Sequence, residues 1–426
     1  GITNDQGSGA SGIESSLNSL LAGTNGKYIY ANGRGNIIPG SEQVSVEAKS
    51  GTSVRLTIDR DVQWVAQNAI SQAVASSRAE SGTVIVMDPK TGAILAQASA
   101  PTFDPNISST ITLNKLRNPA VQEVYEPGST GKVITVAAAL QEGLVTPQSI
   151  FTIPYKMKVA DEYFHDHEKH PTQRLTTTGL LAVSSNTGSI QIGQKLGKET
   201  LYNYLRKFGI GQSTNSKLPG ESAGILHPVK EWSGTSLPTI AFGQGYSLTA
   251  MQSTSVFATI ANDGVRVSPS ILAGVVDESG KYTPAKENES VRVLSSQTAS
   301  NMRAMMESVV SSNGTAPAAA ISGYRIAGKT GTANRFNTAC KCYSGYTASF
   351  IGFAPADQPK YVISVTIQDP KGMHWGGALA GPVFKKVMSF VLQSERVQPT
   401  TAPVTTFKLT EAALKDVKKS TKKAGA

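Results

Sequence analysis

Ser129 and Lys132 have the types and spacing most suggestive of chemistry in this sequence, within the stretch "YEPGSTGKV". A serine hydroxyl becomes a strong nucleophile only when an adjacent base removes its proton. On a helix, residues i and i+3 share a face, so Lys132 would place its amine beside the Ser129 oxygen. A lysine acts as a base when burial or a nearby cation lowers its pKa. The pair fits a nucleophile with its own base, and a helix cap beside a surface lysine has the same spacing.

The K-T-G tripeptide, which could present a cation and two hydrogen-bonding groups, occurs twice. Lys90–Gly92 belongs to a predicted hairpin turn and precedes Ser129, whereas Lys329–Gly331 lies in a strand candidate well after it and continues "TA". The S-x-x-K spacing also recurs at Ser420–Lys423, in a basic tail without a core. We therefore expect the chemistry at Lys329, and interpret the other two matches as coincidental.

An S-x-N tripeptide that could complete a site is best placed at Ser184–Asn186. It interrupts an apolar helical pattern in "GLLAVSSNTGSIQIG", and buried polar groups in such a position need hydrogen-bond partners, which a cleft can supply. Competing matches have no such setting. They are Ser16/Asn18, Ser213/Asn215 and Ser311/Asn313.

The elements that must position these residues predict an α+β domain. A strand and an amphipathic helix follow Gly51, with Asp59 as a candidate N-cap, and residues 82–99 form a predicted hairpin. Many helices follow, then three strand candidates at residues 323–333, 347–356 and 360–369 and a last helix near residues 381–395. This order predicts an antiparallel sheet that draws strands from both ends of the sequence, flanked by helices and a helical subdomain.

Composition and charge are those of a globular protein with a basic surface. The chain has 426 residues, 39% hydrophobic and 16% charged, with a formal net charge of +10. The segment from Val397 onward is rich in Pro, Thr and Lys, which predicts a flexible basic tail over residues 397–426. The positive charge suits an anionic partner such as a cell wall, a membrane surface or nucleic acid. We find no aromatic and basic cluster of the nucleic-acid-binding type, and no apolar run approaches the roughly 18 to 20 residues of a membrane span.

Cysteine is scarce, with only Cys340 and Cys342 in the sequence. Two cysteines are too few for a structural zinc site, and their spacing is not that of a CxxC redox pair. A disulfide over two residues is a strained span that a loop can accommodate. A disulfide and two thiols both remain open from the sequence.

The three motifs in this order resemble class B penicillin-binding proteins, the peptidoglycan D,D-transpeptidases, and most closely their septal division branch. The resemblance extends from Gly51 to about Gln393 and includes "LTIDRDVQ", "VMDPKTGAILAQAS", "AFGQGYSLTAMQ", "YTASFIGFAPADQPKY" and "GGALAGPVF". One departure is Gly131, where that family usually carries a bulkier apolar or aromatic residue.

The resemblance implies a penicillin-binding transpeptidase fold, similar to serine β-lactamases, and a role for each motif residue. Ser129 would attack the carbonyl between two terminal D-alanines of a stem peptide, and Lys132 would take its proton. Ser184 would relay a proton to the departing D-alanine, and Asn186 would hold a substrate amide and Lys132. On the K-T-G strand, Lys329 would supply positive charge, and Thr330, Gly331 and Thr332 would bind the substrate carboxylate. The backbone N–H groups of Ser129 and Thr332 would form the oxyanion hole.

The resemblance also implies an organisation and a setting. Residues 1–50 would be the end of an N-terminal pedestal (dimerisation) domain, residues 51–396 the transpeptidase domain, and residues 397–426 the tail. The enzyme would need no cofactor or metal. We expect it at the extracytoplasmic face of a bacterial plasma membrane, held by an N-terminal transmembrane helix outside this sequence. Stem peptides ending in D-Ala-D-Ala, β-lactams, a membrane-embedded glycan polymerase and other division proteins would be its partners, and nucleic acid would not.

Some residues outside the motifs invite other interpretations. The segment "YFHDHEKHP" places His165, His167 and His170 beside acidic residues, which suggests a metal site, but its similarity to a stretch that precedes S-x-N in this family favours a structural loop. Glu199 follows Asn186 too closely to match the deacylating glutamate of β-lactamases, which favours a solvated helix face. His374 and Trp375 fit either a loop at the edge of the cleft or ordinary packing.

Two other functions compete with the transpeptidase. A β-lactamase or β-lactam sensor would use the same fold, but the sequence places no deacylating glutamate and carries the pedestal remnant. A catalytically silent division scaffold would not need the intact motif residues that are present here.

Overall fold

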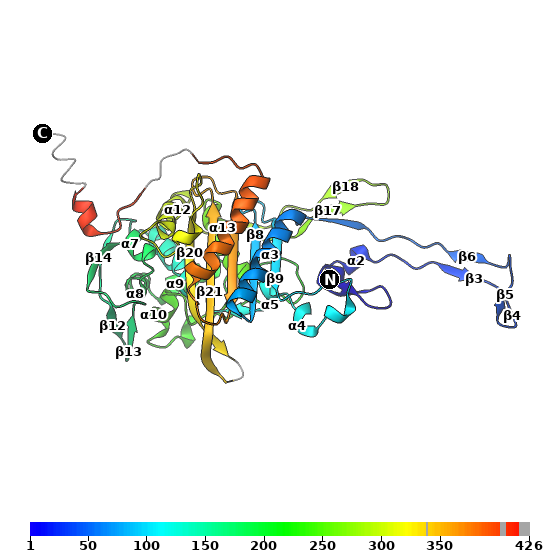
Figure 1. Cartoon of the computed structure of the whole chain (residues 1–426), viewed down its shortest axis with the longest axis horizontal. Helices are drawn as coiled ribbons and strands as arrows, with labels where there is room; N and C mark the ends of the chain where they lie inside the picture. Colours follow the sequence, from blue (N-terminus) through cyan, green and yellow to red (C-terminus); the bar gives the residue numbers. More distant parts are fainter. Residues whose placement is uncertain (338–339, 401–405, 417–426) are drawn as a thin grey trace.

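The computed structural model describes residues 1–337, 340–400 and 406–416, and a five-stranded antiparallel sheet lies at its centre (Figure 1). The strands run in the order β20 (Ala327–Asn337), β21 (Cys342–Ala354), β22 (Tyr361–Gln368), β8 (Ser81–Met87) and β9 (Ile94–Ala100). Two strands from the first quarter of the chain thus pair with three from the last. This confirms the predicted α+β class and a sheet built from both ends of the sequence.

The β8–β9 hairpin closes through a short turn at Asp88–Gly92. The Gly92 N–H donates to the Asp88 carbonyl at 2.9 Å, and the Asp88 carboxylate accepts from the Lys90 N–H at 2.8 Å. The K-T-G at Lys90–Gly92 is therefore part of a hairpin turn, as predicted, and not of the site.

Both faces of the sheet are covered by helices, so its strands are largely buried except at the outer end of the β20–β21 hairpin, where Phe336 and Tyr343 are exposed. Successive residues of a strand point to opposite faces. In β8, Val84 and Val86 pack under α3 (Arg60–Ser77) and α13 (Gly376–Ser394), while Ile85 and Met87 face the other helices. The helix α3 begins where predicted, since the Asp59 carboxylate accepts from the backbone N–H groups of Asp61 and Val62. In Figure 1, α3 and α13 lie across the front of the sheet.

The opposite face carries the helical part of the domain, which positions two of the three motifs. Its helices are α5 (Pro119–Gln122), α6 (Lys132–Gln141), α7 (Thr177–Ala182), α8 (Asn186–Leu196), α9 (Lys198–Lys207), α10 (Ser236–Ala241), α11 (Ala250–Ala261) and α12 (Ser296–Val310). The helix α11 is buried along its whole length and begins with a capping box between Thr249 and Gln252. It packs against the sheet strands β8, β21 and β22 and against α5 and α12, although its sequence mixes apolar residues with Ser, Thr and Gln.

Short strand pairs and one short helix complete the domain. A three-stranded sheet has the order β18 (Tyr282–Pro284), β17 (Leu272–Val276) and β7 (Ser53–Leu56). The pairs are β10 (Val124–Tyr125) with β15 (Leu248–Thr249), β11 (Ile150–Ile153) with β14 (Gln173–Thr176), β12 (Lys156–Val159) with β13 (Glu162–His165), and β16 (Val265–Val267) with β19 (Ser290–Arg292), and the helix is α4 (Leu113–Leu116). Across all described residues, no helix combines the length and the apolar character needed to cross a bilayer.

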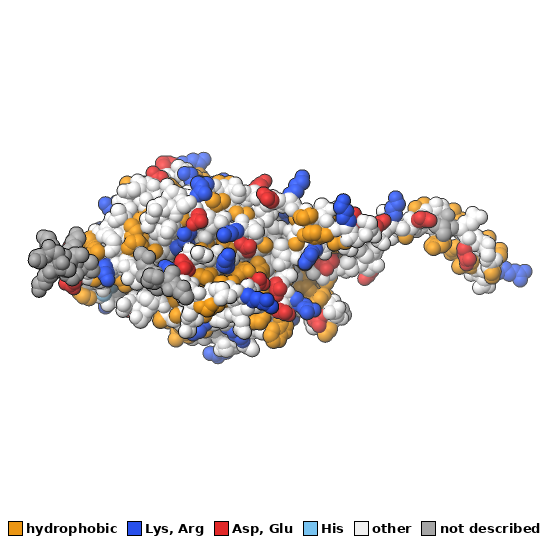
Figure 2. Space-filling model, turned by 90° about the horizontal axis from the view of Figure 1, so that it is seen from above, with side chains coloured by type: hydrophobic (Ala, Val, Ile, Leu, Met, Phe, Trp, Pro, Cys, Tyr) orange, Lys and Arg blue, Asp and Glu red, His pale blue; other side chains and the backbone are white. Residues whose placement is uncertain are grey.

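Residues 1–50 form a thin arm that projects from the domain in Figure 1. It contains β1 (Ile2–Thr3), β2 (Gly9–Ser11), α1 (Gly12–Ser16), α2 (Asn18–Leu21) and the pairs β3 (Lys27–Ile29) with β6 (Gln43–Val46) and β4 (Asn32–Gly33) with β5 (Asn36–Ile37). Its apolar side chains reach solvent: Tyr28 is 67% exposed and Ile29 52% exposed. Figure 2 shows such apolar atoms over the outer end of the arm. The region has little core of its own, as expected.

Part of the segment after Val397 lies against the domain, although we predicted a flexible tail over residues 397–426. The Leu409 carbonyl accepts from the Thr176 N–H at 3.0 Å, and Thr410 forms a β-bridge with Leu175. Phe407 packs against the core, and Glu411 pairs with Arg174 at 2.6 Å. A polar composition predicted mobility, but one apolar side chain and a strand edge at β14 are enough to hold residues 406–411 against the domain.

Candidate active site

Ser129 lies in a tight turn immediately before α6. Residues Gly128–Thr130 form one turn of 3₁₀-helix, and the regular α-helix begins at Lys132. The prediction of a single helix starting at Ser129 is therefore correct only in outline. Gly128 adopts a positive φ of 53°, a conformation that a glycine reaches without strain, and its N–H donates to the Gly243 carbonyl at 2.8 Å. The serine is thus presented at a turn that a neighbouring backbone segment holds in place.

Lys132 is completely buried, at 0% exposure, and its amine points at the S-x-N motif. The amine lies 2.7 Å from Asn186 Oδ1, 2.5 Å from the Ser184 carbonyl and 3.3 Å from Ser184 Oγ. Burial disfavours the charged form and lowers the pKa of Lys132 to about 7, and the Asp166 carboxylate opposes part of that shift. A lysine with this pKa is partly neutral near pH 7 and can accept a proton.

The side chain of Lys329 also contacts Ser184. It comes from β20, the edge strand of the central sheet, and is also 0% exposed. Its amine lies 2.8 Å from Ser184 Oγ. Burial lowers the pKa of Lys329 well below its ordinary value, and the nearby Lys132 amine lowers it further. The Ser184 hydroxyl therefore stands between two buried lysines from different elements.

Ser184 takes its place through an unusual backbone conformation. It lies in the break between α7 and α8 with a φ of +63°, in the left-handed region that serine rarely adopts. The following Ser185 caps α8, since its hydroxyl accepts from the Gly188 N–H at 2.9 Å. The break in the apolar pattern that the sequence showed is thus a helix boundary, and the strained residue directs its hydroxyl to the lysines. Backbone strain of this kind is concentrated at functional sites.

Asp166 organises this helix boundary, a role that we did not predict from the sequence. Its buried carboxylate accepts from the Ser185 hydroxyl at 2.7 Å, from the Asn186 N–H at 2.5 Å and from the Thr187 N–H at 2.9 Å. His170 Nε2 lies 3.1 Å from the same carboxylate. A carboxylate at a helix N-terminus satisfies N–H groups that have no partner within the helix. Asp166 therefore fixes the first turn of α8, which carries Asn186.

The strand β20 lies directly against the turn that carries Ser129. A Cβ atom added to Gly331 would come within 2.3 Å of Ser349 Oγ and 3.0 Å of the Pro127 carbonyl, so only glycine fits here. One added to Gly128 would come within 3.3 Å of the Thr332 carbonyl. The backbone of the turn that carries Ser129 is thus in close contact with the backbone of the K-T-G-T strand. The oxyanion hole formed by the N–H groups of Ser129 and Thr332 stays a prediction.

The two threonines of the K-T-G-T segment are tied to neighbouring loops. Thr332 Oγ1 accepts from the Gly376 N–H at 3.1 Å, at the start of α13, and Thr330 Oγ1 lies 2.8 Å from Thr315 Oγ1. Trp375, next to Gly376, packs edge-on against His167 with ring centroids 4.2 Å apart. The loop with Trp375 therefore lies beside the predicted substrate-binding strand, and contact with a substrate stays a prediction.

The histidine-rich segment serves hydrogen bonding and ring packing. His165 Nδ1 lies 2.8 Å from the Asp166 carbonyl, and His170 contacts the Asp166 side chain. Within the described ranges, no three His, Cys, Asp or Glu side chains are arranged to hold a metal ion. Glu199 is exposed in the first turn of α9, on a solvated helix face as predicted.

The competing motif matches lie apart from the lysine pair. Ser213 and Asn215 bond to Glu221 and Glu289, and Ser311 bonds back to Ser308. Ser16 bonds within the arm, to the Ile13 carbonyl. Ser420–Lys423 lies outside the described residues.

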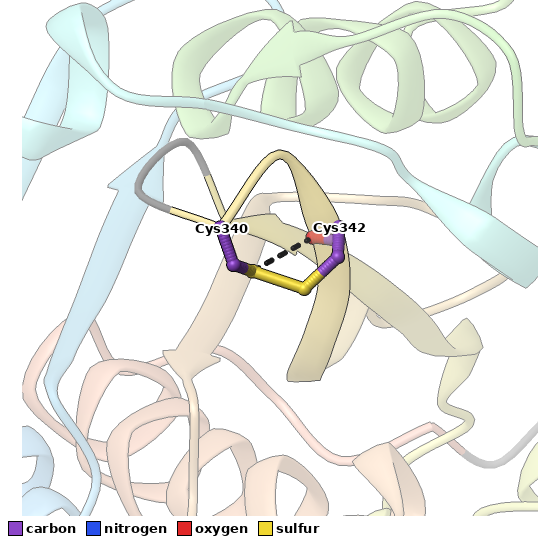
Figure 3. The surroundings of a disulfide bond; sticks show 2 residues. All are labelled: Cys340 and Cys342. Atoms are coloured by element: carbon purple, nitrogen blue, oxygen red, sulfur yellow. Dashed lines mark hydrogen bonds between the residues drawn. A yellow bond between two sulfur atoms is a disulfide. The ribbon is translucent and has the colours of Figure 1, made fainter.

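Of the two alternatives for the cysteines, the structure contains the disulfide. Cys340 and Cys342 are bonded at the tip of the β20–β21 hairpin (Figure 3). Tyr343, next in the chain, donates its hydroxyl to Glu126 Oε1 at 3.2 Å. The hairpin that continues the K-T-G strand thus also contacts the segment that leads to Ser129.

Comparison with curated proteins finds close relatives over most of the chain. A penicillin-binding protein PbpB of Mycolicibacterium smegmatis is 40% identical over 95% of this chain. The Mycobacterium tuberculosis protein of the same name is 40% identical over 92% of it. The chain spans 64% and 59% of the length of these two relatives. A probable peptidoglycan D,D-transpeptidase PenA of Neisseria flavescens is 34% identical, and here the match covers 93% of this chain and 97% of the relative.

Solved structures agree with this result. Penicillin binding protein 3 of Mycobacterium tuberculosis, without ligand, superposes with a TM-score of 0.86 at 36% identity, covering 96% of this chain and 90% of that one. The same protein complexed with ampicillin gives a TM-score of 0.87.

The penicillin binding protein transpeptidase domain family matches residues 82–389. That range includes Ser129, the S-x-N segment and the K-T-G strand, together with the central sheet apart from Ser81. With this match and the relatives above, the chain belongs to the penicillin-binding protein transpeptidase family, in the class B septal group that the sequence motifs indicated.

Proposed function

We propose that this protein is a peptidoglycan D,D-transpeptidase that works through an acyl-enzyme on Ser129. The observation that carries the proposal is the Ser184 hydroxyl, which contacts the buried amines of Lys132 and Lys329 at 3.3 and 2.8 Å. Three motifs from α6, the α7–α8 break and β20 thereby meet at one group. Such a set of coupled proton carriers, in which Lys132 follows Ser129 by three residues in the chain, is suited to acyl transfer.

In the first step, Ser129 Oγ attacks the carbonyl carbon between the two terminal D-alanines of a stem peptide. Its proton passes to the neutral amine of Lys132, whose lowered pKa makes it an effective acceptor near pH 7. The backbone N–H groups of Ser129 and Thr332 stabilise the oxyanion that forms. When the C–N bond breaks, the departing D-alanine amine takes a proton through Ser184, and the acyl group remains on the Ser129 oxygen.

In the second step, an amine from a neighbouring stem peptide attacks the ester carbonyl. That amine loses a proton to Lys132 and forms the new amide, and the Ser129 oxygen regains its hydrogen. The atoms balance without a cofactor: one peptide bond is exchanged for another, and free D-alanine is released.

Lys329 has a role that depends on the substrate. Its pKa is low in the structure because it is buried beside Lys132. A substrate carboxylate placed beside Thr330 and Thr332 would favour the charged amine and return the pKa upward. Substrate binding and protonation of Lys329 would therefore be coupled, so that the charge is present when the carboxylate is bound.

A β-lactam would follow the first step and stop there. Its amide bond breaks when Ser129 attacks, but the leaving nitrogen stays attached to the acyl group and obstructs the acceptor amine. The complexes of the Mycobacterium tuberculosis relative with aztreonam and with ampicillin support this part of the proposal.

The names of the same relatives support a proposal for the setting of the protein. We assign residues 1–50 to the end of a pedestal domain and residues 51–396 to the transpeptidase domain. We place the protein at the outer face of a bacterial plasma membrane, anchored by an N-terminal helix and working with a glycan polymerase in cell division. The name FtsI of a related Escherichia coli transpeptidase, 35% identical over 94% of this chain, supports the division role.

The test is a reaction with a donor peptide ending in D-Ala-D-Ala and an acceptor amine. The proposal predicts equal amounts of free D-alanine and of the cross-linked amide, and neither with Ser129→Ala. Release of D-alanine without cross-linked product at saturating acceptor would instead indicate a hydrolase.

A further inference from the structure

Tyr246 is a buried tyrosine whose hydroxyl lies against Gly131, in the turn between Ser129 and Lys132. Its side chain is 2% exposed, and its hydroxyl has no hydrogen-bond partner among the described residues. Burying a hydroxyl without a partner is unfavourable, so such a group in a native structure needs an explanation. The phenol oxygen is directed at Gly131. A Cβ atom added to Gly131 would lie 2.3 Å from Tyr246 Oη, far inside contact distance.

Space, not backbone conformation, requires glycine at position 131. Its φ of −67° and ψ of −23° are ordinary right-handed helical angles that any residue adopts. The Cβ position is blocked by the Tyr246 hydroxyl and, at 2.9 Å, by Gly243 Cα. The tyrosine therefore occupies the volume that a side chain at position 131 would otherwise fill.

The segment that carries Tyr246 contacts the nucleophile turn at further points. The Gly243 carbonyl accepts from the Gly128 N–H at 2.8 Å, and the Gly245 N–H donates to Glu126 Oε1 at 2.9 Å. These two contacts hold the entry to the turn. The contact between Tyr246 and Gly131 fixes the end of the same turn, between Ser129 and Lys132. On the other side, β20 lies against the same turn, so any shift changes the distance from Ser129 to the K-T-G strand.

We propose that Tyr246 is a positioning residue for the serine nucleophile. Its phenol fills the space that a side chain at position 131 would occupy, and it thereby sets the distance between the Ser129–Lys132 turn and β20. The inference rests on the proposed acylation of Ser129. It makes the two residues interdependent, because each fits only while the other is present.

The experiment compares the rate of acylation by a fluorescent penicillin in four proteins. These are the unaltered protein, the single variants Gly131→Ala and Tyr246→Phe, and the variant that combines both substitutions. A displacement of about 1 Å near the reacting atoms can cost about 100-fold in rate, and we expect a loss of that order for Gly131→Ala. We expect Tyr246→Phe alone to lose about tenfold, since the turn is then less firmly held. In the double variant, removal of the oxygen makes room for the new methyl group, and the rate should exceed that of Gly131→Ala by about tenfold.

A matched control removes a different buried hydroxyl close by. Tyr125, on β10, is 6% exposed and lies within 3.4 Å of Thr366 Oγ1. Gly131→Ala combined with Tyr125→Phe should be no faster than Gly131→Ala alone. The rate constant of acylation is measured separately from the affinity for penicillin, because a positioning defect lowers the first and leaves the second.

Each possible result either supports the proposal or overturns it. Rescue by Tyr246→Phe and not by Tyr125→Phe supports the proposal. A wild-type rate for Gly131→Ala, or a double variant no faster than that single variant, overturns it. If Gly131→Ala does not fold, a tenfold slower acylation of Tyr246→Phe at unchanged affinity supports the proposal, and an unchanged rate overturns it. Absence of labelling in the unaltered protein would instead contradict the proposed function.

Discussion

The amine of Lys132 lies 2.7 Å from Oδ1 of Asn186, which joins the first residue of α6 to the first residue of α8. The two residues are 54 positions apart in the chain. Both helices direct their N-terminal ends at one point, where β20 adds Lys329. The site is thus built at helix ends and on a sheet edge, which are rigid parts of the fold. Its geometry is set by the packing of α6 on α8 and by the contact of β20 with the nucleophile turn.

The Ser184 hydroxyl connects the two lysines, and we predict that its removal stops proton transfer more than binding. Ser184→Ala should lower the rate of acylation by about 100- to 10,000-fold, the usual range for loss of a positioned proton carrier. Stopped-flow measurement with a chromogenic β-lactam gives this rate. Ser189→Ala serves as the control, since that buried hydroxyl on α8 donates to the Ser185 carbonyl. A Ser184→Ala protein with normal acylation would remove Ser184 from the mechanism.

The pKa of Lys132 predicts a specific dependence on pH. Only the neutral amine can accept the serine proton, and burial lowers the pKa to about 7. The rate of acylation should therefore rise by about tenfold per pH unit below pH 7 and level off above it. Lys132→Arg should be inactive at all pH values, because a guanidinium does not lose its proton. A flat profile from pH 5 to 8 would contradict Lys132 as the base.

Asp166 should contribute both to the stability of the first turn of α8 and to the pH dependence of acylation. Its charge raises the pKa of Lys132 against the effect of burial, so Asp166→Asn should move the midpoint of the profile to lower pH. The variant should also lose about 1–3 kcal/mol in the free energy of unfolding, because N–H groups at the start of α8 lose a charged acceptor. Urea denaturation measures the second effect. Glu168→Gln, an exposed neighbour, should change neither quantity, and an unshifted midpoint in Asp166→Asn would argue against the electrostatic link.

The segment that ends at Asp416 should stabilise the domain without taking part in chemistry. Truncation after Thr400 removes the packing of Phe407 and the backbone bonds to Thr176, a loss of roughly 1 kcal/mol that should lower Tm by about 1–2 °C in a domain of this size. Truncation after Asp416 keeps these contacts and should leave Tm unchanged. Equal melting temperatures for the two truncated proteins would show that the contacts contribute nothing to stability.

Much of this fold was predictable because its signals are local. The β8–β9 hairpin, the three C-terminal strands and the cap at Asp59 each follow from a pattern of a few residues. The proximity of Lys132, Ser184, Asn186 and Lys329 was predictable because their motifs occur in a fixed order, and the structure brings these side chains together. Their roles in a reaction stay predictions.

The remaining features depend on contacts between distant residues. Asp166 lies 19 to 21 positions from the groups that it binds, so no short pattern marks it as a cap. Tyr246 and Gly131 meet through packing alone. The tail was predicted to be mobile from its composition, but pairing with the edge of β14 depends on a neighbour that the sequence of the tail does not contain.

The central claim, that Ser129 is the nucleophile, is tested most directly by mass spectrometry of the penicillin-treated protein. The account predicts a single adduct with the full mass of the antibiotic, found on the peptide that contains Ser129 and absent from Ser129→Ala. An adduct on any other residue, or an adduct that persists in Ser129→Ala, would contradict it.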